Sequence, residues 1–461
     1  MSTQDIQPNK FSELRSIFKY HIDSYNALYQ LKTKNKDELN SIYKLIKTNL
    51  IDSKKYLPQN IIKDIFDIIQ YNNRYSKSYL TLIKLIYDDY QVKEVNNIDV
   101  VSNYLFYKEY GIILNNDFER NISENLEILS ASEIYRAIMD NDLENFIVIT
   151  ERDGFDKDQK IEDYDVAYSL LEFCCYHSAV DCFKFLRTKF NSEITETCLE
   201  LSFLGGNPDI MSECLKYQIP FQGCMKNAII SHNIDFVTFL MNEHKLEIYP
   251  TECGEYNNLE AFLVFFDQKN NSNECFINSA RFNIPSLCEY FLLHGANINY
   301  LDDERTNALH HAVYYNCYET VEFLISLGVS INEKDKDGRT ALHLAAYFNS
   351  KETMELLISH GANINEKDKD GRTSLHYAAH NKHKEASELL ISHGANINEK
   401  DKDGRTVLYY ATINNSKETI ELLISHSANI NEKDKDGRTV LYYATINNSK
   451  ETIELLISHS E

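Results

Sequence analysis

The chain has 461 residues, more than one ordinary hydrophobic core accommodates, and its hydrophobic content of 43% is sufficient for folding. Its 47 basic and 70 acidic residues give a formal net charge of −23, which disfavours nucleic acid and anionic membrane surfaces as partners. No apolar run approaches the about 18 residues of a membrane span, and the first residues lack the apolar segment of a secretory signal. We therefore expect an intracellular protein, in the cytoplasm with the nucleus left open, whose ten cysteines are reduced.

Residues 1–130 are expected to form a helical N-terminal domain. Apolar residues recur there with the spacing of amphipathic helices, and the 33-residue signature found later in the chain is absent from the sequence of this region. Pro58 suits the first turn of a helix, because its missing N–H would have no partner there. The segments with helical spacing are residues 11–31, 37–49, 58–71 and 76–90.

Residues 131–300 are expected to form degenerate helix pairs, most of them without a protruding β-hairpin, or finger. The start of a second helix recurs in steps of 25 to 28 residues, enough for two antiparallel helices and a turn but too short for a finger. We expect the first finger of ordinary length after residues 294–299. The recurring helix starts are at Asp181, Asp209, Asp235, Glu260 and Ser286.

Residues 301–461 are expected to form regular repeats. The string INEKDKDGRT occurs four times with a period of 33 residues, and a period of this length is typical of stacked-repeat architectures. Within one copy, Asp335, Asp337 and Gly338 favour a turn, and Thr340 is suited to cap the helix that follows. Gly361 is suited to end the second helix of that unit in the left-handed conformation.

Three patterns could instead carry metal or redox chemistry. Residues 333–338 look like the first half of a calcium loop, but Leu344 stands where such a loop needs a bidentate carboxylate. Histidines that recur once per repeat lie too far apart to share a zinc ion. We favour turns and structural histidines, and we predict no metal, no cofactor and no catalytic site. Calcium, zinc and a redox role for the vicinal cysteines 174–175 stay open as minor alternatives.

The repeat unit resembles the ankyrin repeat. Its pattern is G-x-T-x-L-H-x-A-A, then E-x-x-x-L-L, then G-A-N-I-N, as in GRTALHLAA (338–346) and GRTSLHYAA (371–379). The last two units depart from it, with Tyr409 and Tyr442 in the place of the histidine. The resemblance implies an all-α solenoid of stacked helix pairs with short β-hairpin fingers, preceded by a helical N-terminal region.

A second resemblance concerns the front of the chain. Residues 57–90, together with the helix pairs behind them, are similar to the front end of a large protozoan family of ankyrin proteins. That front end is a domain of unknown function, so the resemblance implies a layout and no activity.

The ankyrin resemblance also assigns structural roles. It implies a histidine that ties the start of each first helix to neighbouring backbone, and glycines that close the turns and end the second helices. The residues expected to act in this way are His310, Gly338, Thr340, His343, Gly361, Gly371, Thr373, His376, Gly394, Gly404 and Gly437.

A partner-binding groove is implied at the places where the repeats vary. In ankyrin repeats the end of the first helix and the hairpin tip line a concave surface, and here these places carry aromatic residues flanked by charges. We expect a non-catalytic scaffold that binds other proteins there, although the aromatic residues could instead pack against the neighbouring repeat. The expected contact residues are Asp303, Glu304, Thr306, Tyr314, Tyr315, Lys336, Asp337, Arg339, Tyr347, Phe348, Lys369, Asp370, Arg372, His380 and Asn381.

The alternative hypothesis is a structural or self-associating repeat protein that assembles through its exposed C-terminal repeat. Residues 398–427 and 431–460 are identical, so the last repeat copies an internal one instead of presenting a polar outer face. Its outer side should expose apolar residues. Ser427 and Ser460 replace the glycine that ends the second helix, and we expect this pair of repeats to be looser.

Overall fold

The structure of the protein is a computed structural model that describes residues 10–95, 98, 100–115, 133–163, 166–269 and 271–459. It divides into two compact units, Met1–Asn270 and Asn271–Glu461. The three predicted domain ranges stay predictions, and parts of the first of them, residues 1–9, 96–97, 99 and 116–130, lie outside the described residues. Ser460 lies outside them as well.

The first unit begins with helices close to the predicted segments. Pro58 occupies the first turn of its helix, as expected. The predicted segment 11–31 is two helices, because the backbone leaves the helical conformation at Phe18. The helices are α1 (Lys10–Ile17), α2 (Lys19–Tyr29), α3 (Lys36–Ile46), α4 (Pro58–Ile69), α5 (Ser76–Tyr90) and α6 (Val100–Tyr110), with a π-helical segment at Lys47–Ile51 and a 3-10 turn, η2, at Asn73–Tyr75.

These N-terminal helices bury one continuous apolar core. The helix α4 contributes Ile61, Ile65 and Phe66, which are almost completely buried and pack with the inward face of α5. The hydroxyl of Tyr25 on α2 donates to the Asp64 carboxylate at 2.6 Å, so its polar end is satisfied within the core. The region therefore has its own core.

Five helix pairs follow in the first unit. One pair, α8 with α9, precedes a β-hairpin, and the next four are joined by short turns, as the recurring helix starts predicted. The pairs are α8 (Glu133–Met139) with α9 (Leu143–Thr150), α10 (Leu170–Tyr176) with α11 (Val180–Lys189), α12 (Glu196–Gly205) with α13 (Pro208–Cys214), α14 (Gln222–Ile230) with α15 (Ile234–His244), and α16 (Pro250–Glu255) with α17 (Leu259–Lys269).

One hairpin in this region corrects the expectation that the first finger follows residues 294–299. Strands β1 (Lys160–Asp163) and β2 (Val166–Ser169) pair antiparallel, with Lys160 opposite Ser169. The hairpin forms because α9 and α10 are separated by a longer segment than the later pairs, and this segment has room for two strands. The recurrence of helix starts was measured only from Asp181 onward, so it carried no information about this longer connection.

A left-handed residue marks the turn inside each helix pair. It is either the first or the second residue after the end of the first helix. It reverses the chain so that the second helix packs antiparallel to the first. In the first unit these residues are Asn141, Ser178, Gly206, His232 and Asn257, and in the second they are Asn283, Asn316, Asn349, Lys382, Asn415 and Asn448.

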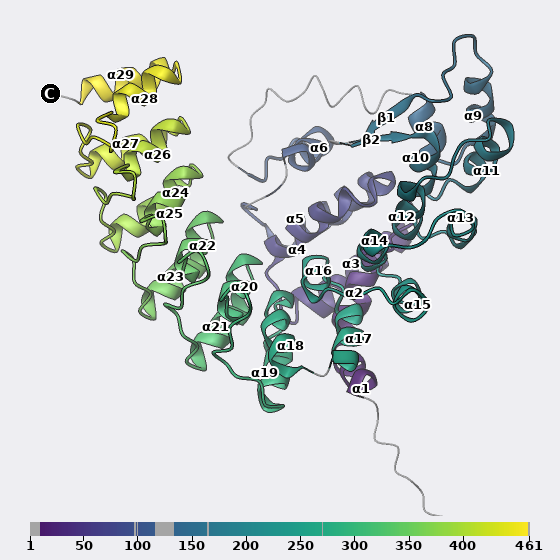
Figure 1. Cartoon of the computed structure of the whole chain (residues 1–461), viewed down its shortest axis with the longest axis horizontal. Helices are drawn as coiled ribbons and strands as arrows, with labels where there is room; N and C mark the ends of the chain where they lie inside the picture. Colours follow the sequence, from purple (N-terminus) through teal and green to yellow (C-terminus); the bar gives the residue numbers. More distant parts are fainter. Residues whose placement is uncertain are drawn as a thin grey trace, which may run out of the picture. The chain divides into compact units, whose positions relative to one another are not determined.

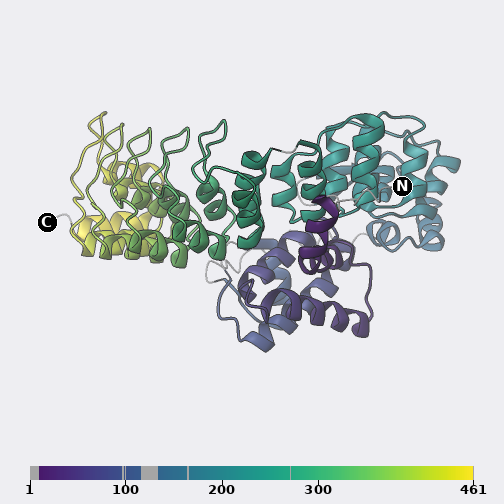
Figure 2. The same ribbon diagram turned by 90° about the horizontal axis from the view of Figure 1, so that it is seen from below.

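The second unit is a stack of six helix pairs, which confirms the predicted all-α solenoid. In Figure 1, α20, α22 and α24 lie in one row and α21, α23 and α25 in another. Figure 2 shows the loops between successive pairs projecting to the same side. The pairs are α18 (Ser272–Ser279, followed by the 3-10 turn η4, Ala280–Phe282) with α19 (Pro285–Leu293), α20 (Ala308–Tyr314) with α21 (Tyr318–Ser326), α22 (Ala341–Tyr347) with α23 (Lys351–Ser359), α24 (Ser374–His380) with α25 (Lys384–Ser392), α26 (Val407–Ile413) with α27 (Lys417–Ser425), and α28 (Val440–Ile446) with α29 (Lys450–Ser458).

Hydrogen bonds between successive hairpin tips join these repeats. The backbone N–H of Lys369 donates to the carbonyl of Asp337 at 2.8 Å, and the N–H of Lys402 donates to the carbonyl of Asp370 at 2.7 Å. The same bond joins Lys336 to Glu304 one repeat earlier. Because each tip satisfies backbone groups of the next, its geometry must repeat with the period of the stack.

Side chains of the INEKDKDGRT string also bond from one repeat to the next. Asn332 accepts from the N–H of Asn363 at 2.8 Å and donates to the carbonyl of Gly361 at 3.0 Å. The Lys334 ammonium donates to the carbonyl of Lys367 at 2.9 Å and pairs with Glu366 at 2.7 Å. The residues that recur in this string therefore make the contacts between successive repeats.

The last repeat exposes apolar side chains, as expected. Tyr442, Ile446 and Ile457 are all at least 44% exposed. Ile413, which occupies the place of Ile446 one repeat earlier, is only partly exposed. Ser427 adopts the left-handed conformation with φ of 67°, which costs a residue with a Cβ about 1 kcal/mol relative to glycine.

Replacing Gly338 by Ala should destabilise the protein more than the same change at Gly437. Both glycines have φ near +80°, but a Cβ at Gly338 would lie 2.8 Å from the backbone nitrogen of Lys369, whereas a Cβ at Gly437 would meet nothing within 4 Å. We expect a loss of about 1 kcal/mol for Gly437→Ala and at least about 2 kcal/mol for Gly338→Ala, measured by urea unfolding. Equal losses would contradict close packing of the tips.

Candidate protein-binding surface

The structure brings the four predicted aromatic residues together. The helices α20 and α22 end in Tyr314 and Tyr347, and the residues that follow them are Tyr315 and Phe348. The ring of Tyr314 contacts that of Phe348 with centroids 4.9 Å apart, and Tyr347 contacts Phe348 at the same distance. Tyr314 is 53% exposed and Tyr347 is 43% exposed. We call these four residues the aromatic turn surface.

Within this surface, two residues are exposed and two pack against neighbouring groups. The hydroxyl of Tyr315 accepts from Arg281 at 2.6 Å, and the guanidinium of Arg281 lies 4.8 Å from the centre of its ring. Tyr315 and Phe348 are partly buried. Exposure toward a partner therefore applies to Tyr314 and Tyr347, and packing within the stack applies to Tyr315 and Phe348. Sequence analysis did not include Arg281 among the contact residues. Asn283 occupies the same turn position as Asn316 in the next pair, and this match could have placed Arg281 near the turn.

Further along the stack the surface becomes more polar. His380 lies 5.8 Å from the ring of Tyr410 and is mostly exposed, and Asn381 donates to the carbonyl of Tyr377 at 2.9 Å. Tyr377 was also missed by the sequence analysis. Its ring lies 6.3 Å from that of Tyr347, and its hydroxyl donates to Asp368 at 2.7 Å. The signal that could have found it is a tyrosine that recurs 33 residues later at Tyr410.

The hairpin tips carry charges that are largely paired within the chain. Arg339 pairs with Asp335 at 2.8 Å and with Asp337 at 3.0 Å, and one repeat later Arg372 pairs in the same way with the corresponding Asp368 and Asp370. Lys336 pairs with Glu304 at 3.2 Å. The pairs with Asp337, Asp370 and Glu304 are exposed and add little stability, whereas Asp335 and Asp368 are buried and their bonds hold Arg339 and Arg372 on their own tips.

The remaining predicted tip residues lie at the same edge of the stack. Asp303, Glu304 and Lys369 are exposed, while the hydroxyl of Thr306 donates to the Asp302 carboxylate at 2.6 Å. A partner would therefore meet a mixed set of charges there. The role of all these residues in binding stays a prediction.

Asp335 shows how the acidic string works as a turn. One of its carboxylate oxygens accepts from the backbone N–H groups of Asp337 and Arg339 at 2.9 and 2.7 Å, and the other accepts from the Arg339 side chain. These bonds engage the carboxylate at the third place of the calcium loop that residues 333–338 resemble. Among the residues that the structure describes, no group of three or more His, Cys, Asp or Glu side chains could hold a metal ion.

The histidines predicted to be structural accept the backbone N–H at the start of their helices. His310 and His343 also reach the next repeat, whereas the buried Nε2 of His376 has no hydrogen-bond partner among the described residues. His343 accepts the backbone N–H of Thr340 on Nδ1 at 3.1 Å, and its Nε2 lies 3.2 Å from the carbonyl of Arg372 in the next repeat, to which it donates. His310 joins its N-cap Asn307 in the same way. Burial lowers the pKa of both histidines, and it lowers the pKa of His376 to about 4.

The cysteines and the helix lengths add two observations. All ten cysteines are free and buried, and burial raises the pKa of the Cys174 thiol, which disfavours the reactive thiolate. None of the helices in the described part of the chain is long and apolar enough to cross a membrane.

Comparison with known proteins gives the class of the repeats. A family model described as Ankyrin repeats (3 copies) matches residues 324–401 and 394–461, and one described as Ankyrin repeats (many copies) matches residues 292–345. A model described as Domain of unknown function (DUF3447) matches residues 190–265. No curated protein matches the chain.

The chain therefore carries ankyrin repeats, a protein-interaction module, behind a domain of unknown function. The match to that domain covers helix pairs of the first unit and lies behind residues 57–90. The relation to a protozoan family stays a prediction.

Acid should destabilise the repeats through His376. Since burial holds its folded pKa at about 4, below the ordinary 6.5, the unfolded chain takes up the proton first as the pH falls. The contribution of neutral His376 to the free energy of unfolding is complete above pH 6.5 and decreases as the pH falls toward about 4. Between pH 7 and pH 5 we expect His376 to account for about 1 to 2 kcal/mol of lost unfolding free energy.

The control for this prediction is His376→Tyr, since Tyr409 occupies the same place one repeat later. Urea unfolding of both proteins at pH 7 and pH 5 should show a smaller loss in the variant. An identical loss would mean that His376 does not carry the effect.

Proposed function

We propose that this chain is a non-catalytic scaffold that binds a partner protein through the aromatic turn surface and the neighbouring hairpin tips of its ankyrin repeats. Exposed aromatic side chains with a polar rim are typical of the centres of protein interfaces. Tyr314 and Tyr347 have this exposure, and they are bordered by the charged tips. The proposed partner contributes an α-helical segment.

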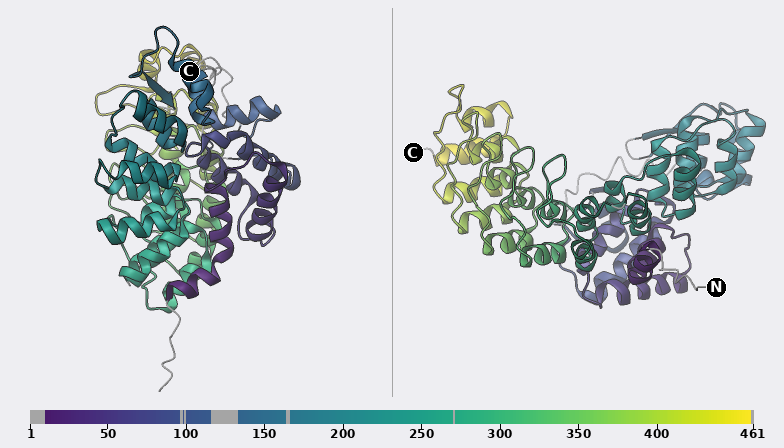
Figure 3. Two further views of the ribbon diagram at one scale, coloured as in Figure 1. Left: turned by 90° about the vertical axis from the view of Figure 1, so that its right-hand side faces the viewer. Right: turned by 60° about the horizontal axis from the view of Figure 1, so that its bottom comes forward.

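The observation that supports a helical partner comes from the first unit. There the same turns of the helix pairs are covered by the chain's own N-terminal helices, which lie along one side of the pairs in Figures 2 and 3. Tyr29, the last residue of α2, stacks on His232 with ring centres 4.1 Å apart, and Gln30 donates to the carbonyl of His232 at 2.7 Å. At the next turn Tyr71 contacts Tyr256 with ring centres 5.6 Å apart.

The positions in the two units correspond. His177 follows the last residue of α10 and precedes a left-handed residue, as Tyr315 does after α20. Arg74 donates to the carbonyl of His177 at 3.4 Å, and the Tyr176 hydroxyl donates to the carbonyl of Gln70. The turn face of these pairs therefore accepts helix ends, and its equivalent at Tyr314 is exposed.

A second candidate function is self-association through the last repeat. The exposure of Tyr442, Ile446 and Ile457 favours it, because contiguous exposed apolar side chains are often covered in an assembly. Sedimentation of the purified chain over a wide range of concentrations separates the two candidates, since a chain that stays monomeric has no such interface.

Replacing Tyr314 and Tyr347 by Ala should weaken partner binding while the fold persists. Both side chains are about half exposed, so their removal leaves little cavity, whereas loss of an interface anchor costs about 2 kcal/mol or more. The intact chain and the double variant would be used to capture partners from a native extract. A partner retained by the intact chain and lost by the variant would then be purified and its affinity measured.

The matched control is Tyr217→Ala, which removes a tyrosine that is 56% exposed in the first unit. Circular dichroism would show that all three proteins are folded. The proposal fails if the double variant binds every captured partner as tightly as the intact chain, or if Tyr217→Ala loses the same partners.

A further inference from the structure

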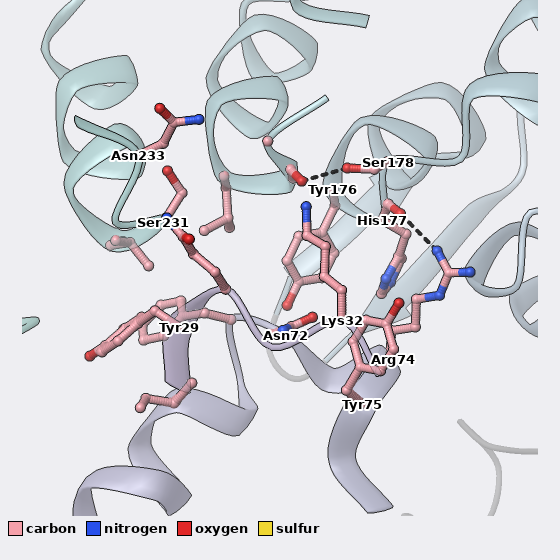
Figure 4. Close-up of a pocket in the computed structure, with 17 residues that line it drawn as sticks. Tyr29, Lys32, Asn72, Arg74, Tyr75, Tyr176, His177, Ser178, Ser231 and Asn233 are labelled. Atoms are coloured by element: carbon pink, nitrogen blue, oxygen red, sulfur yellow. Dashed lines mark hydrogen bonds between the residues drawn. The ribbon is translucent and has the colours of Figure 1, made fainter. Parts of the chain in front are cut away.

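A pocket of about 330 Å³ with a mixed polar and apolar lining lies within the first unit, separate from the aromatic turn surface. Its walls come from residues that follow α2, from η2, and from the turns of three successive helix pairs (Figure 4). In Figure 4 the residues of the N-terminal segments lie along the lower side of the pocket, and those of the helix-pair turns lie along its upper side. Its volume is at the lower end of the range for small-molecule sites, so it suits a small ligand.

The charge of this pocket is opposite to that of the chain. The protein has a net charge of −23, yet Lys32 and Arg74 line the pocket and none of its lining residues is Asp or Glu. Two cations that face one space without a carboxylate repel each other, and an anion between them would relieve this. Burial lowers the pKa of Lys32, and the positive charge of Arg74 lowers this pKa further.

Both cations have hydrogen-bonding capacity to spare. Among the described residues, the Nε of Arg74 is buried without a hydrogen-bond partner, and its two terminal nitrogens reach the carbonyls of His177 and Asp140 at 3.4 Å. In the described part of the chain Lys32 makes no side-chain hydrogen bond or ion pair, whereas the nearby Lys34 pairs with the Asp140 carboxylate at 3.2 Å. The Nε of Arg74 is a buried donor, which is costly to leave unpaired unless a ligand takes it, whereas the Lys32 side chain is exposed at the pocket wall.

His177 also has a ring nitrogen without a hydrogen-bond partner among the described residues. This nitrogen is Nε2, the side chain is buried, and burial together with Arg74 lowers its pKa to about 3. The imidazole is therefore neutral near pH 7 and can donate a single N–H. By contrast, other polar wall residues are already bonded: Ser178 donates to the carbonyl of Gly205 at 2.5 Å, and Asn72 donates to the carbonyl of Leu31 at 2.7 Å.

We propose that this pocket binds a small ligand through its phosphate group, held by Lys32 and Arg74 and bordered by His177. A phosphate carries a charge of about −1.5 to −2 near pH 7, which balances two cations, and its oxygens suit the fork of a guanidinium. The ring of Tyr75 also lines the pocket and offers an apolar wall for an organic part. The ligand is free phosphate or a small phosphate monoester.

Titration calorimetry of the intact chain with inorganic phosphate, glycerol phosphate and acetate tests this proposal. We expect saturable binding of at least one phosphate ligand, and we expect Lys32→Gln and Arg74→Gln each to weaken it about ten- to hundredfold, the value of a hydrogen bond to a charged group. Lys32→Arg should retain binding. Tighter binding of glycerol phosphate than of phosphate would identify a monoester, and equal binding would identify free phosphate.

The matched control is Lys36→Gln, which removes the same charge from an exposed residue outside the pocket. Circular dichroism would verify that each variant is folded. The proposal is overturned if neither phosphate ligand binds, if acetate binds more tightly than phosphate, or if Lys36→Gln weakens binding as much as Lys32→Gln. None of these outcomes depends on a partner at the aromatic turn surface.

Discussion

The hydrogen bond from one hairpin tip to the next is the interaction on which the repeat array depends. Among the described residues, the N–H of Lys369 and the carbonyl of Asp337 bond to each other across two repeats and to no backbone group of their own repeat. Each tip is therefore completed by its neighbour. The Asn332 side chain likewise bonds to Gly361 and Asn363 of the following repeat. This requirement explains why INEKDKDGRT repeats without change while residues at the helix ends vary.

The second consequence of stacking is a turn face that can be covered or exposed. In every described pair a left-handed residue reverses the chain, and the end of the first helix then lies at the edge of the stack. In the first unit this edge holds His232 and Tyr256 against the N-terminal helices, and the same arrangement encloses the pocket at Lys32 and Arg74. In the second unit the corresponding edge carries exposed tyrosines. One structural rule thus produces a covered surface and an exposed one.

The sequence predicted those features that depend on local spacing. Periodicity and caps located α4 and α5 almost to the residue, and the 33-residue period located the turns, the N-cap threonines and the structural histidines. The hairpin β1–β2 was missed because it occurs once and has no repeated signature. The contact of Arg281 with Tyr315 and the pocket that joins Lys32 to Arg74 depend on residues distant in sequence, and no local pattern encodes such contacts.

Hydroxyl-radical footprinting of the tyrosines in the purified intact chain tests the central claim most directly, because it reports which turn faces are covered. The account predicts that Tyr314 and Tyr347 are modified rapidly, and that Tyr256 and Tyr176, at the corresponding turns of the first unit, are protected. Protection of Tyr314 and Tyr347 in the monomeric chain would contradict it, since the surface proposed for a partner would already be covered. Rapid modification of Tyr256 would equally contradict the covered face of the first unit.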